Sequence, residues 1–250
     1  MRTEDFDQMV KNVLGDTPPR VWSLLVTIFG DLALAKDARL SGASVNALTA
    51  AIGIKPEATR VALHRLRKEG WIESHRTGRQ SKYSLTANGR TETMAARPRV
   101  YATTSPSRQP AVVIDNAGAE ADRNLSVQVL AGIRVQALPV ESQTAWVLPM
   151  GDAIPNWVRD KFCPVEAQTA SQRLAESLVS IDPTRLDALQ ATALRSVIVP
   201  EWRRLILRVP DFPDACFPDG WRGAECRAVV MDLLAHLPAP TADDLNRLVS

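Results

Sequence analysis

The residues best suited to bind a partner through hydrogen bonds and apolar contacts lie close together, between positions 57 and 68. Arginine can donate two hydrogen bonds to guanine O6 and N7, histidine can donate one to an acceptor, and valine can contact the methyl group of thymine. Arg60, His64 and Val61 offer these three groups on one face of a predicted helix. Their spacing therefore predicts a helix whose outer face reads base edges in the major groove of DNA.

Three more charged residues of this helix have less specific candidate roles. Glu57 could accept a hydrogen bond from a cytosine amino group, but an acid in the first helical turn also stabilises the helix dipole, and both interpretations stay open. Arg67 and Lys68 lie in the last turn. We expect them to contact phosphates, which increases affinity without adding sequence specificity.

The elements that must position these side chains are the helix itself and a second helix before it. Pro56 suits the first helical position and Gly70 a C-terminal stop, so the helix is predicted from Pro56 to about Glu69. Its other face carries a stripe spaced to meet a core: Thr59, Ala62, Leu63 and Leu66. Upstream, residues 44–54 predict a first helix with a serine N-cap, and Gly53 predicts the tight turn of a helix-turn-helix.

A hairpin is predicted directly after this helix. Residues 71–76 and 80–85 have strand character, and Thr77 and Gly78 supply the turn. The hairpin tip is basic, with side chains expected to contact phosphates or the minor groove: Arg76, Arg79 and Lys82. A helix-turn-helix followed by a basic two-stranded hairpin is the plan of a winged helix, so the sequence predicts a domain that binds double-stranded DNA.

A basic helix and hairpin are often no more than a solvated surface, and the distribution of charge bears on this alternative. Residues 55–99 hold eleven Lys and Arg against four Asp and Glu, whereas residues 102–250 hold fourteen against eighteen. The whole chain has a formal net charge of only +2. One strongly basic segment in a nearly neutral chain favours nucleic-acid binding over a general surface.

The order of elements predicts an α+β protein. Residues 1–101 are expected to form the winged helix-turn-helix domain, with further helices at 3–14, 21–29 and 87–97. The helix at 3–14 either packs on this domain or crosses to a second subunit. Residues 102–110 are small, polar and proline-containing, which is typical of a linker.

Beyond the linker, residues 111–150 predict a small ferredoxin-like α/β segment of the order β-α-β-β. Its strands are expected at 111–114, 134–139 and 144–148, and its helix at 124–132. Residues 151–250 predict an all-helical C-terminal domain for effector binding or dimerisation, in which Pro200 interrupts a helix.

Composition and motifs argue against several classes of protein. The chain is 45% hydrophobic, enough for a core, yet no apolar run approaches the about 20 residues of a membrane span, and the acidic N-terminus is unlike a signal peptide. The three cysteines and three histidines lack metal-ligand spacing, so we expect thiols in a reducing cytoplasm, no metal and no cofactor. An enzyme is not expected, because GxSxG, HExxH and phosphate-binding glycine loops are absent from the sequence. A winged-helix module that binds proteins instead of DNA stays open.

Two separated stretches of the sequence resemble the PaaX family, the phenylacetate-degradation repressors. The first is RVALHRLRKEGWIESHRTGRQSKYSLT, from Arg60 to Thr86, with FGD at 29–31 upstream. The second is WRRLILRVPDFPDACFPDGWRG, from Trp202 to Gly223. The resemblance implies a dimeric cytoplasmic repressor of aromatic-catabolism genes that binds a near-palindromic operator and is released by an aryl-acyl-CoA such as phenylacetyl-CoA. An activator without a response to acyl-CoA is the alternative within this class.

The second stretch also holds candidate residues for the effector. An acyl-CoA needs cations for its phosphates and an apolar pocket for its aryl group. The stretch offers both kinds of side chain: Trp202, Arg203, Arg204, Arg208, Trp221 and Arg222. Core tryptophans with surface arginines explain the same residues, so this interpretation stays open. The chain departs from the family's pattern in a shorter middle segment and in Pro200, which stands where the family often has a histidine.

Overall fold

The computed structural model describes most of the chain and divides it into two compact units. The described residues are 3–15, 19–77, 80–115, 122–140, 144–151, 153–237 and 239–249. Unit 1 consists of residues 1–98, 177–202 and 230–250, and unit 2 of residues 99–176 and 203–229. Each unit therefore combines segments that are far apart in the sequence. Helices and two antiparallel sheets are both present, so the predicted α+β class is confirmed.

The helix-turn-helix lies in unit 1 and begins at a serine cap. The short strand β1 (Leu40–Ser41) leads into helix α3 (Gly42–Ala51), and the Oγ of Ser41 accepts a hydrogen bond from the backbone N–H of Ser44 at 3.0 Å. The N-cap is therefore Ser41, three residues earlier than the predicted start, because its hydroxyl satisfies an otherwise unpaired helix N–H. Gly53, with a φ of +79°, makes the turn into the next helix.

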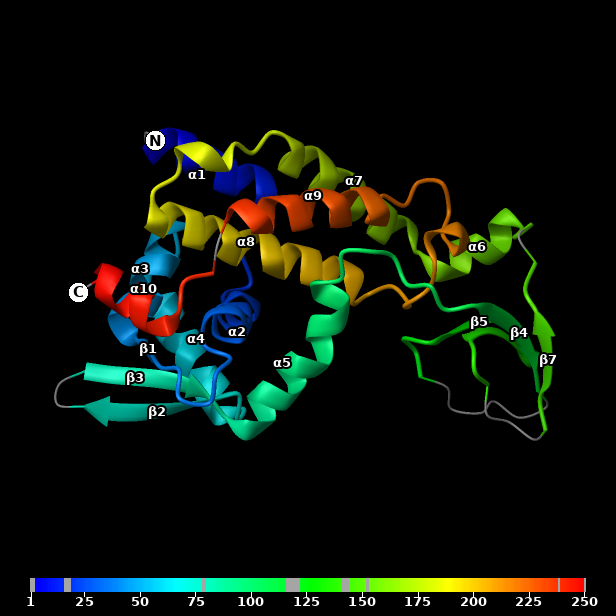
Figure 1. Ribbon diagram of the computed structural model, residues 1–250, viewed down its shortest axis with the longest axis horizontal. Coiled ribbons are helices and arrows are strands. Elements are labelled where there is room, and N and C mark those ends of the chain that lie inside the picture. The colour runs from blue at the N-terminus through cyan, green and yellow to red at the C-terminus, as the bar shows by residue number, and fades with distance from the viewer. Residues whose placement is uncertain are drawn as a thin grey trace. The chain divides into compact units, whose positions relative to one another are not determined.

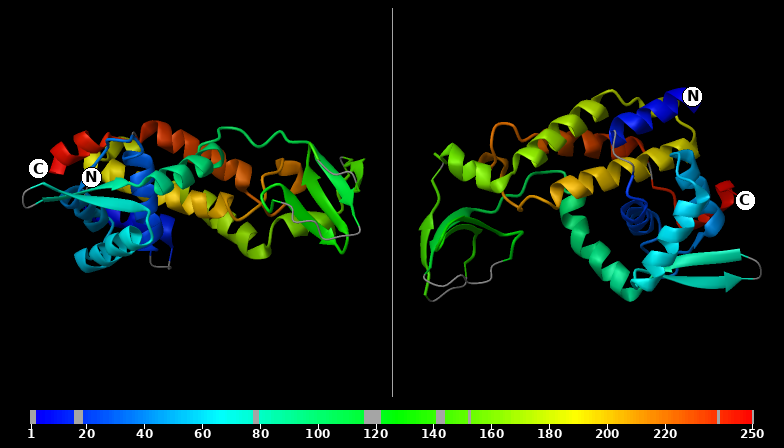
Figure 2. Two further views of the ribbon diagram at one scale, coloured as in Figure 1. Left: turned by 90° about the horizontal axis from the view of Figure 1, so that it is seen from below. Right: turned by 180° about the vertical axis from the view of Figure 1, so that it is seen from behind.

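Helix α4 (Pro56–Lys68) confirms the predicted helix and its inner stripe. The stripe residues are at most 7% exposed: Thr59, Ala62, Leu63 and Leu66. The predicted hairpin follows as β2 (Ile72–Thr77) and β3 (Gln80–Leu85), and β1 pairs with β3 to complete a three-stranded antiparallel sheet. The hairpin strands project beyond the neighbouring helices of unit 1 (Figures 1 and 2).

Two further N-terminal helices of unit 1 support this motif. Helix α1 (Thr3–Leu14) matches the prediction, whereas α2 (Val21–Leu32) continues beyond its predicted end at Gly30. A Cβ at Gly30 would lie 2.8 Å from the Cγ2 of Thr93, so the glycine permits close packing against α5 (Ala87–Val100) and does not end the helix.

Two prolines lie inside helices of the structure, although the helix at 87–97 was predicted to end before Pro98 and Pro200 was predicted to interrupt a helix. Pro98 lies inside α5, and Pro200 lies inside α8 (Ala188–Ile206). A proline inside a helix removes one backbone hydrogen bond and costs about 3 kcal/mol. In α8 packing offsets this cost, because the residues around Pro200 are at most 1% exposed: Ala193, Leu194, Val197, Ile198, Val199 and Trp202.

A buried ion pair joins α8 to α2. Arg195 donates from Nε to Asp31 Oδ2 at 2.5 Å and from Nη2 to Asp31 Oδ1 at 3.1 Å. Its Nη1 also donates to the backbone oxygens of Leu234 and Leu237, at the end of helix α9 (Gly223–His236). One arginine from the C-terminal half therefore joins α2, α8 and the end of α9 through residues that all lie in unit 1.

Unit 2 contains the second sheet, which differs from the predicted middle segment. Its four strands, in the order β5-β6-β4-β7, are all antiparallel: β4 (Pro110–Ile114), β5 (Ser126–Leu130), β6 (Ile133–Ala137) and β7 (Trp146–Pro149). The predicted helix at 124–132 is wrong, so the β-α-β-β order is wrong as well. Val127 and Val129 are buried whereas Gln128 and Leu130 are exposed, a period of two, and Gly132 closes a tight turn with a φ of +72°.

The helices of unit 2 surround an aromatic cluster. Helix α6 (Asn156–Phe162) precedes α7 (Val165–Val179), and a short 3₁₀ turn spans Asp214–Cys216; a second 3₁₀ turn, Pro183–Arg185, belongs to unit 1. The rings of the cluster lie 5.1 to 6.0 Å apart: Phe162, Phe212, Phe217 and Trp221. Among the described residues, no helix is both long enough and apolar enough to cross a membrane.

Candidate nucleic-acid interface

The outer face of α4 carries all the side chains that the sequence assigns to it. Each of the six predicted DNA contacts on this helix is exposed: Glu57, Arg60, Val61, His64, Arg67 and Lys68. Val61 is 69% exposed, although it is apolar and belongs to a helix with a well-packed inner face. The outer face therefore offers a cation, an imidazole and a small apolar group to a partner, the set of groups that base edges require.

The orientation of α4 is fixed from its inner face. Thr59 donates its hydroxyl to the hydroxyl of Thr49 on α3 at 2.9 Å, and both residues are fully buried. Thr49 in turn donates to the backbone oxygen of Val45 at 3.0 Å. A buried hydrogen bond between two helices is directional, so it sets the angle of the second helix against the first.

A separate cluster anchors the C-terminal end of α4. Arg65 donates to Glu69 at 2.7 Å, Trp22 donates its indole N–H to the other oxygen of Glu69 at 2.7 Å, and the guanidinium of Arg65 lies 5.7 Å from the Trp22 ring centroid. The hydrogen bond from Arg65 lowers the pKa of Glu69. Arg65 is thus engaged in joining α4 to α2, and sequence reasoning did not place it among the DNA contacts.

The hairpin presents its basic residues with different exposure. Arg76 on β2 is exposed and Lys82 on β3 is half-buried, whereas the predicted contact Arg79 lies outside the described residues. His75 stands opposite Lys82 and shares a hydrogen bond of 2.9 Å with the hydroxyl of Ser84. The histidine therefore links β2 to β3 across the hairpin.

A C-terminal helix that the sequence analysis missed holds the start of the helix-turn-helix. Helix α10 (Ala242–Val249) lies beside β1 and α3 (Figure 1). The side-chain oxygen of Asn246 accepts from the backbone N–H of Ser41 and from the hydroxyl of Ser44, both at 2.8 Å. Its amide nitrogen donates to the backbone oxygen of Arg39 at 2.8 Å. Apolar and polar residues recur at helical spacing over 242–249, and this pattern could have predicted the helix.

The six candidate effector residues are divided between the two units. Trp202 in unit 1 is fully buried, and Trp221 in unit 2 stacks on Phe217 with ring centroids 5.3 Å apart. The four arginines belong to unit 2, where Arg203 and Arg204 are half-buried and Arg208 and Arg222 are exposed. Burial lowers the pKa of Arg203. Both tryptophans occupy protein cores, as the alternative interpretation expects, and the effector assignment stays a prediction.

The histidine, cysteine and acidic side chains of the described residues bear on metal binding and on thiol chemistry. In the part of the chain that the structure describes, no three His, Cys, Asp or Glu residues lie close enough together to hold a metal ion. The three cysteines are buried, and burial raises the pKa of Cys163 and Cys226 to about 12 and that of Cys216 to about 11. These thiols are therefore protonated and poorly nucleophilic near neutral pH.

Comparison with known proteins matches both ends of the chain to one family. The family model described as PaaX-like protein matches residues 20–89, and the model described as PaaX-like protein C-terminal domain matches residues 166–247. The transcriptional repressor PaaX of Escherichia coli (strain K12) is 22% identical over 273 aligned residues, which cover 94% of this chain and 86% of the relative.

A solved structure has a similar fold. The uncharacterized protein Rv0674 from Mycobacterium tuberculosis superimposes with a TM-score of 0.51 and 20% sequence identity, covering 91% of this chain and 97% of that one. At this identity the likeness concerns the fold. Because 91% of this chain is covered, the likeness includes most of the segment between the two family matches, residues 90–165.

Proposed function

The chain belongs to the PaaX-like family, and on this basis we propose that it is a transcriptional repressor that binds double-stranded DNA through α4 and the β2–β3 hairpin. The observation that carries the proposal is the exposed face of α4, with Arg60, Val61 and His64 in solvent on a helix held in helix-turn-helix geometry. The name of the Escherichia coli relative supports repression as the outcome of binding.

Each residue has a role in this proposal. Arg60 donates to guanine O6 and N7, His64 donates to a base acceptor, and Val61 meets a thymine methyl group. The other cations assigned to α4 and the hairpin bind phosphates and set the register of the protein on the duplex: Arg67, Lys68, Arg76, Arg79 and Lys82. Glu57 either accepts from a cytosine amino group or stabilises the helix dipole of α4.

The finer parts of the proposal concern assembly and effector. We assign DNA binding to residues 1–101 and effector binding and dimerisation to residues 151–250. A homodimer would place two copies of α4 on a near-palindromic operator, because two-fold symmetry of the protein matches two-fold symmetry of the site. The regulated genes would belong to aromatic catabolism, and an aryl-acyl-CoA such as phenylacetyl-CoA would release the protein from DNA.

Footprinting on the DNA upstream of the protein's own gene tests DNA binding and dimerisation together. A protected site with two half-sites about 10 base pairs or a multiple of that apart is expected, and binding that weakens steeply as salt is raised. A single short protected half-site would contradict the dimer. No protection at low salt would contradict the repressor and favour the alternative of a winged helix that binds proteins.

The effector is tested on the same complex. We expect one member of a panel of aryl-acyl-CoA thioesters to release the protein from its site, and the variant Arg203→Ala/Arg204→Ala to bind that thioester more weakly in a calorimetric titration. Unchanged thioester affinity of the variant would contradict the assignment of these two arginines. Free CoA serves as the control for binding through the phosphates alone.

A further inference from the structure

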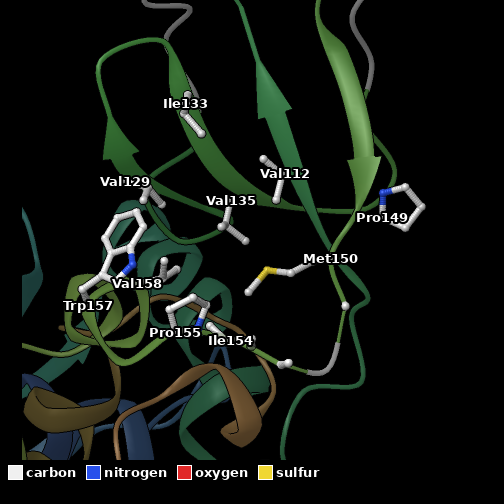
Figure 3. A pocket seen from close by; sticks show the side chains of 12 residues that line it. Val112, Val129, Ile133, Val135, Pro149, Met150, Ile154, Pro155, Trp157 and Val158 are labelled. Carbon is white, nitrogen blue, oxygen red and sulfur yellow. The ribbon is translucent and has the colours of Figure 1, made fainter.

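A cavity separates one face of the four-stranded sheet of unit 2 from α6. Its volume is about 280 Å³. Val112 of β4 and Val135 of β6 stand opposite each other in the register and so point to the same side of the sheet. The opposite wall comes from Trp157 and Val158 of α6, and the side chain of Met150 extends from the end of β7 over the middle of the cavity (Figure 3).

The side chains that line the cavity are nearly all apolar. None of the described residues that line the cavity is charged, and the indole N–H of Trp157 is the one polar side-chain group among them. Val135 is 2% exposed and Val158 is 9% exposed, whereas Trp157 is 51% exposed and stands at the side of the cavity (Figure 3). Water gains few hydrogen bonds in such a space, so an apolar group that replaces it binds favourably.

We propose that this cavity binds one monocyclic aromatic group. An apolar cavity of about 150 Å³ is enough to bind benzene, so the present volume accepts a ring with a short substituent. The indole of Trp157 and the thioether of Met150 favour an aromatic over an aliphatic occupant, because both make specific contacts with aromatic rings. None of the described lining side chains carries a charge that would pair with a carboxylate, a phosphate or an ammonium group, so an uncharged ring suits this lining better.

The size of the site argues for a small molecule over a protein partner. A stable protein–protein interface buries about 800 Å² on each partner, whereas this cavity has room for a single ring. The ring can belong to a free aromatic molecule or to the acyl end of a thioester. A consequence of ring binding for DNA release rests on the proposed function, but the binding itself does not.

Toluene is the probe that tests the cavity in the full-length protein. With methionine methyl groups labelled with ¹³C, toluene should shift the Met150 resonance, assigned with the variant Met150→Leu. The resonance of Met94, which is 58% exposed on α5, should not move. An unmoved Met150 resonance near the aqueous solubility limit of toluene would overturn the proposal, and so would an equal shift of both resonances.

Two matched substitutions locate the site. Val112→Phe fills the cavity and should weaken toluene binding at least about tenfold, because the new ring occupies the ligand's volume. Leu130→Phe adds a ring of the same kind on β5 at a residue that is 53% exposed and does not line the cavity, and affinity should stay within about twofold. Equal affinity of the wild type and Val112→Phe would overturn the proposal. If Val112→Phe does not fold, the methyl shifts of the wild type decide.

Competition then separates the two sources of the ring. Displacement of toluene by phenylacetyl-CoA but not by CoA supports an acyl thioester as the source, and toluene retained at saturating phenylacetyl-CoA supports a free aromatic molecule. Binding of DNA without binding of toluene overturns this inference and leaves the proposed function standing. Binding of toluene without binding of DNA supports this inference and contradicts the proposed function.

Discussion

Replacing Arg195 with methionine should destabilise the protein more than most single substitutions. The guanidinium makes four hydrogen bonds, two to the carboxylate of Asp31 and two to the carbonyl oxygens of Leu234 and Leu237. The side chains of Arg195 and Asp31 are 9% and 6% exposed. Methionine fills a similar volume but removes the charge and every donor, so the carboxylate of Asp31 stays buried without this guanidinium.

The size of the expected loss of stability follows from the burial of the Arg195–Asp31 ion pair. Removing one member of a buried ion pair costs about 3–5 kcal/mol, because the other charge remains desolvated. The two backbone oxygens at the end of α9 lose a charged donor as well, which places the variant toward the upper end of that range. At about 2–4 °C per kcal/mol for a chain of this size, a loss of about 4–5 kcal/mol should lower Tm by about 8–20 °C.

Urea unfolding followed by tryptophan fluorescence measures this loss, since Trp22 and Trp71 lie in unit 1 and contact each other edge to face. Arg195→Lys keeps the charge but not the paired geometry, so it should fall between the wild type and Arg195→Met. The double variant Arg195→Met/Asp31→Leu should recover most of the stability, because it leaves no buried charge at this position. A loss below about 1 kcal/mol for Arg195→Met, or a double variant no better than the single one, would refute the reasoning.

Four further predictions concern the hairpin, α10 and the thiols. Arg76→Ala should weaken binding to all duplexes alike and lower the slope of log K against log salt by about one, and unequal losses across sequences would show that Arg76 reads bases. Asn246→Ala removes three hydrogen bonds and should cost about 1–3 kcal/mol, with faster amide exchange at the start of α3, and unchanged exchange there would contradict the role of α10. Burial raises the pKa of the three cysteine thiols to about 11 or 12, so they should react with a thiol reagent at pH 8 only after unfolding. Because the unfolded chain ionises these thiols near pH 9 while the folded chain keeps them protonated, stability should decrease as the pH rises from about 9 towards 12, and a flat profile would contradict the raised pKa values.

The parts of the molecule that sequence reasoning predicted correctly are those determined by local pattern. The inner stripe of α4, the proline at its first position and the glycine after it are all set within one segment, and the helix forms where they predict. The strands of the hairpin follow for the same reason. The exposed face of α4 was predictable because a helix with one apolar stripe must present the opposite residues to solvent.

The errors arose where the local pattern was too short to interpret or where packing overrides local propensity. Residues 126–130 alternate with a period of two, but five residues are too few to distinguish a strand from a helix when the flanks are ambiguous. Pro98 and Pro200 are helix breakers by propensity, and the buried surroundings of α8 compensate for the loss at Pro200. Tertiary contacts that a single sequence does not reveal decided the case of Pro200.

Long-range polar contacts were also beyond the reach of the sequence. Arg195 and Asp31 are separated by 164 residues, and Asn246 and Ser41 by 205. Neither pair forms a recognisable motif, because the partners meet only when the C-terminal helices pack on the N-terminal ones. These contacts make segments from both ends of the chain part of the unit that carries α4.

Sequence-specific DNA binding by α4 is tested most directly by comparing Arg60→Ala with Arg65→Ala. Both residues are exposed arginines of the same helix, but Arg65 is engaged with Glu69 and Trp22, whereas Arg60 belongs to the outer face. Fluorescence anisotropy would compare a duplex from upstream of the gene with a scrambled duplex. Arg60→Ala should reduce the preference for the specific duplex by about 1–3 kcal/mol, and Arg65→Ala should leave that preference unchanged. Equal affinity of the wild type for both duplexes, or an equal loss of preference in both variants, would contradict the account.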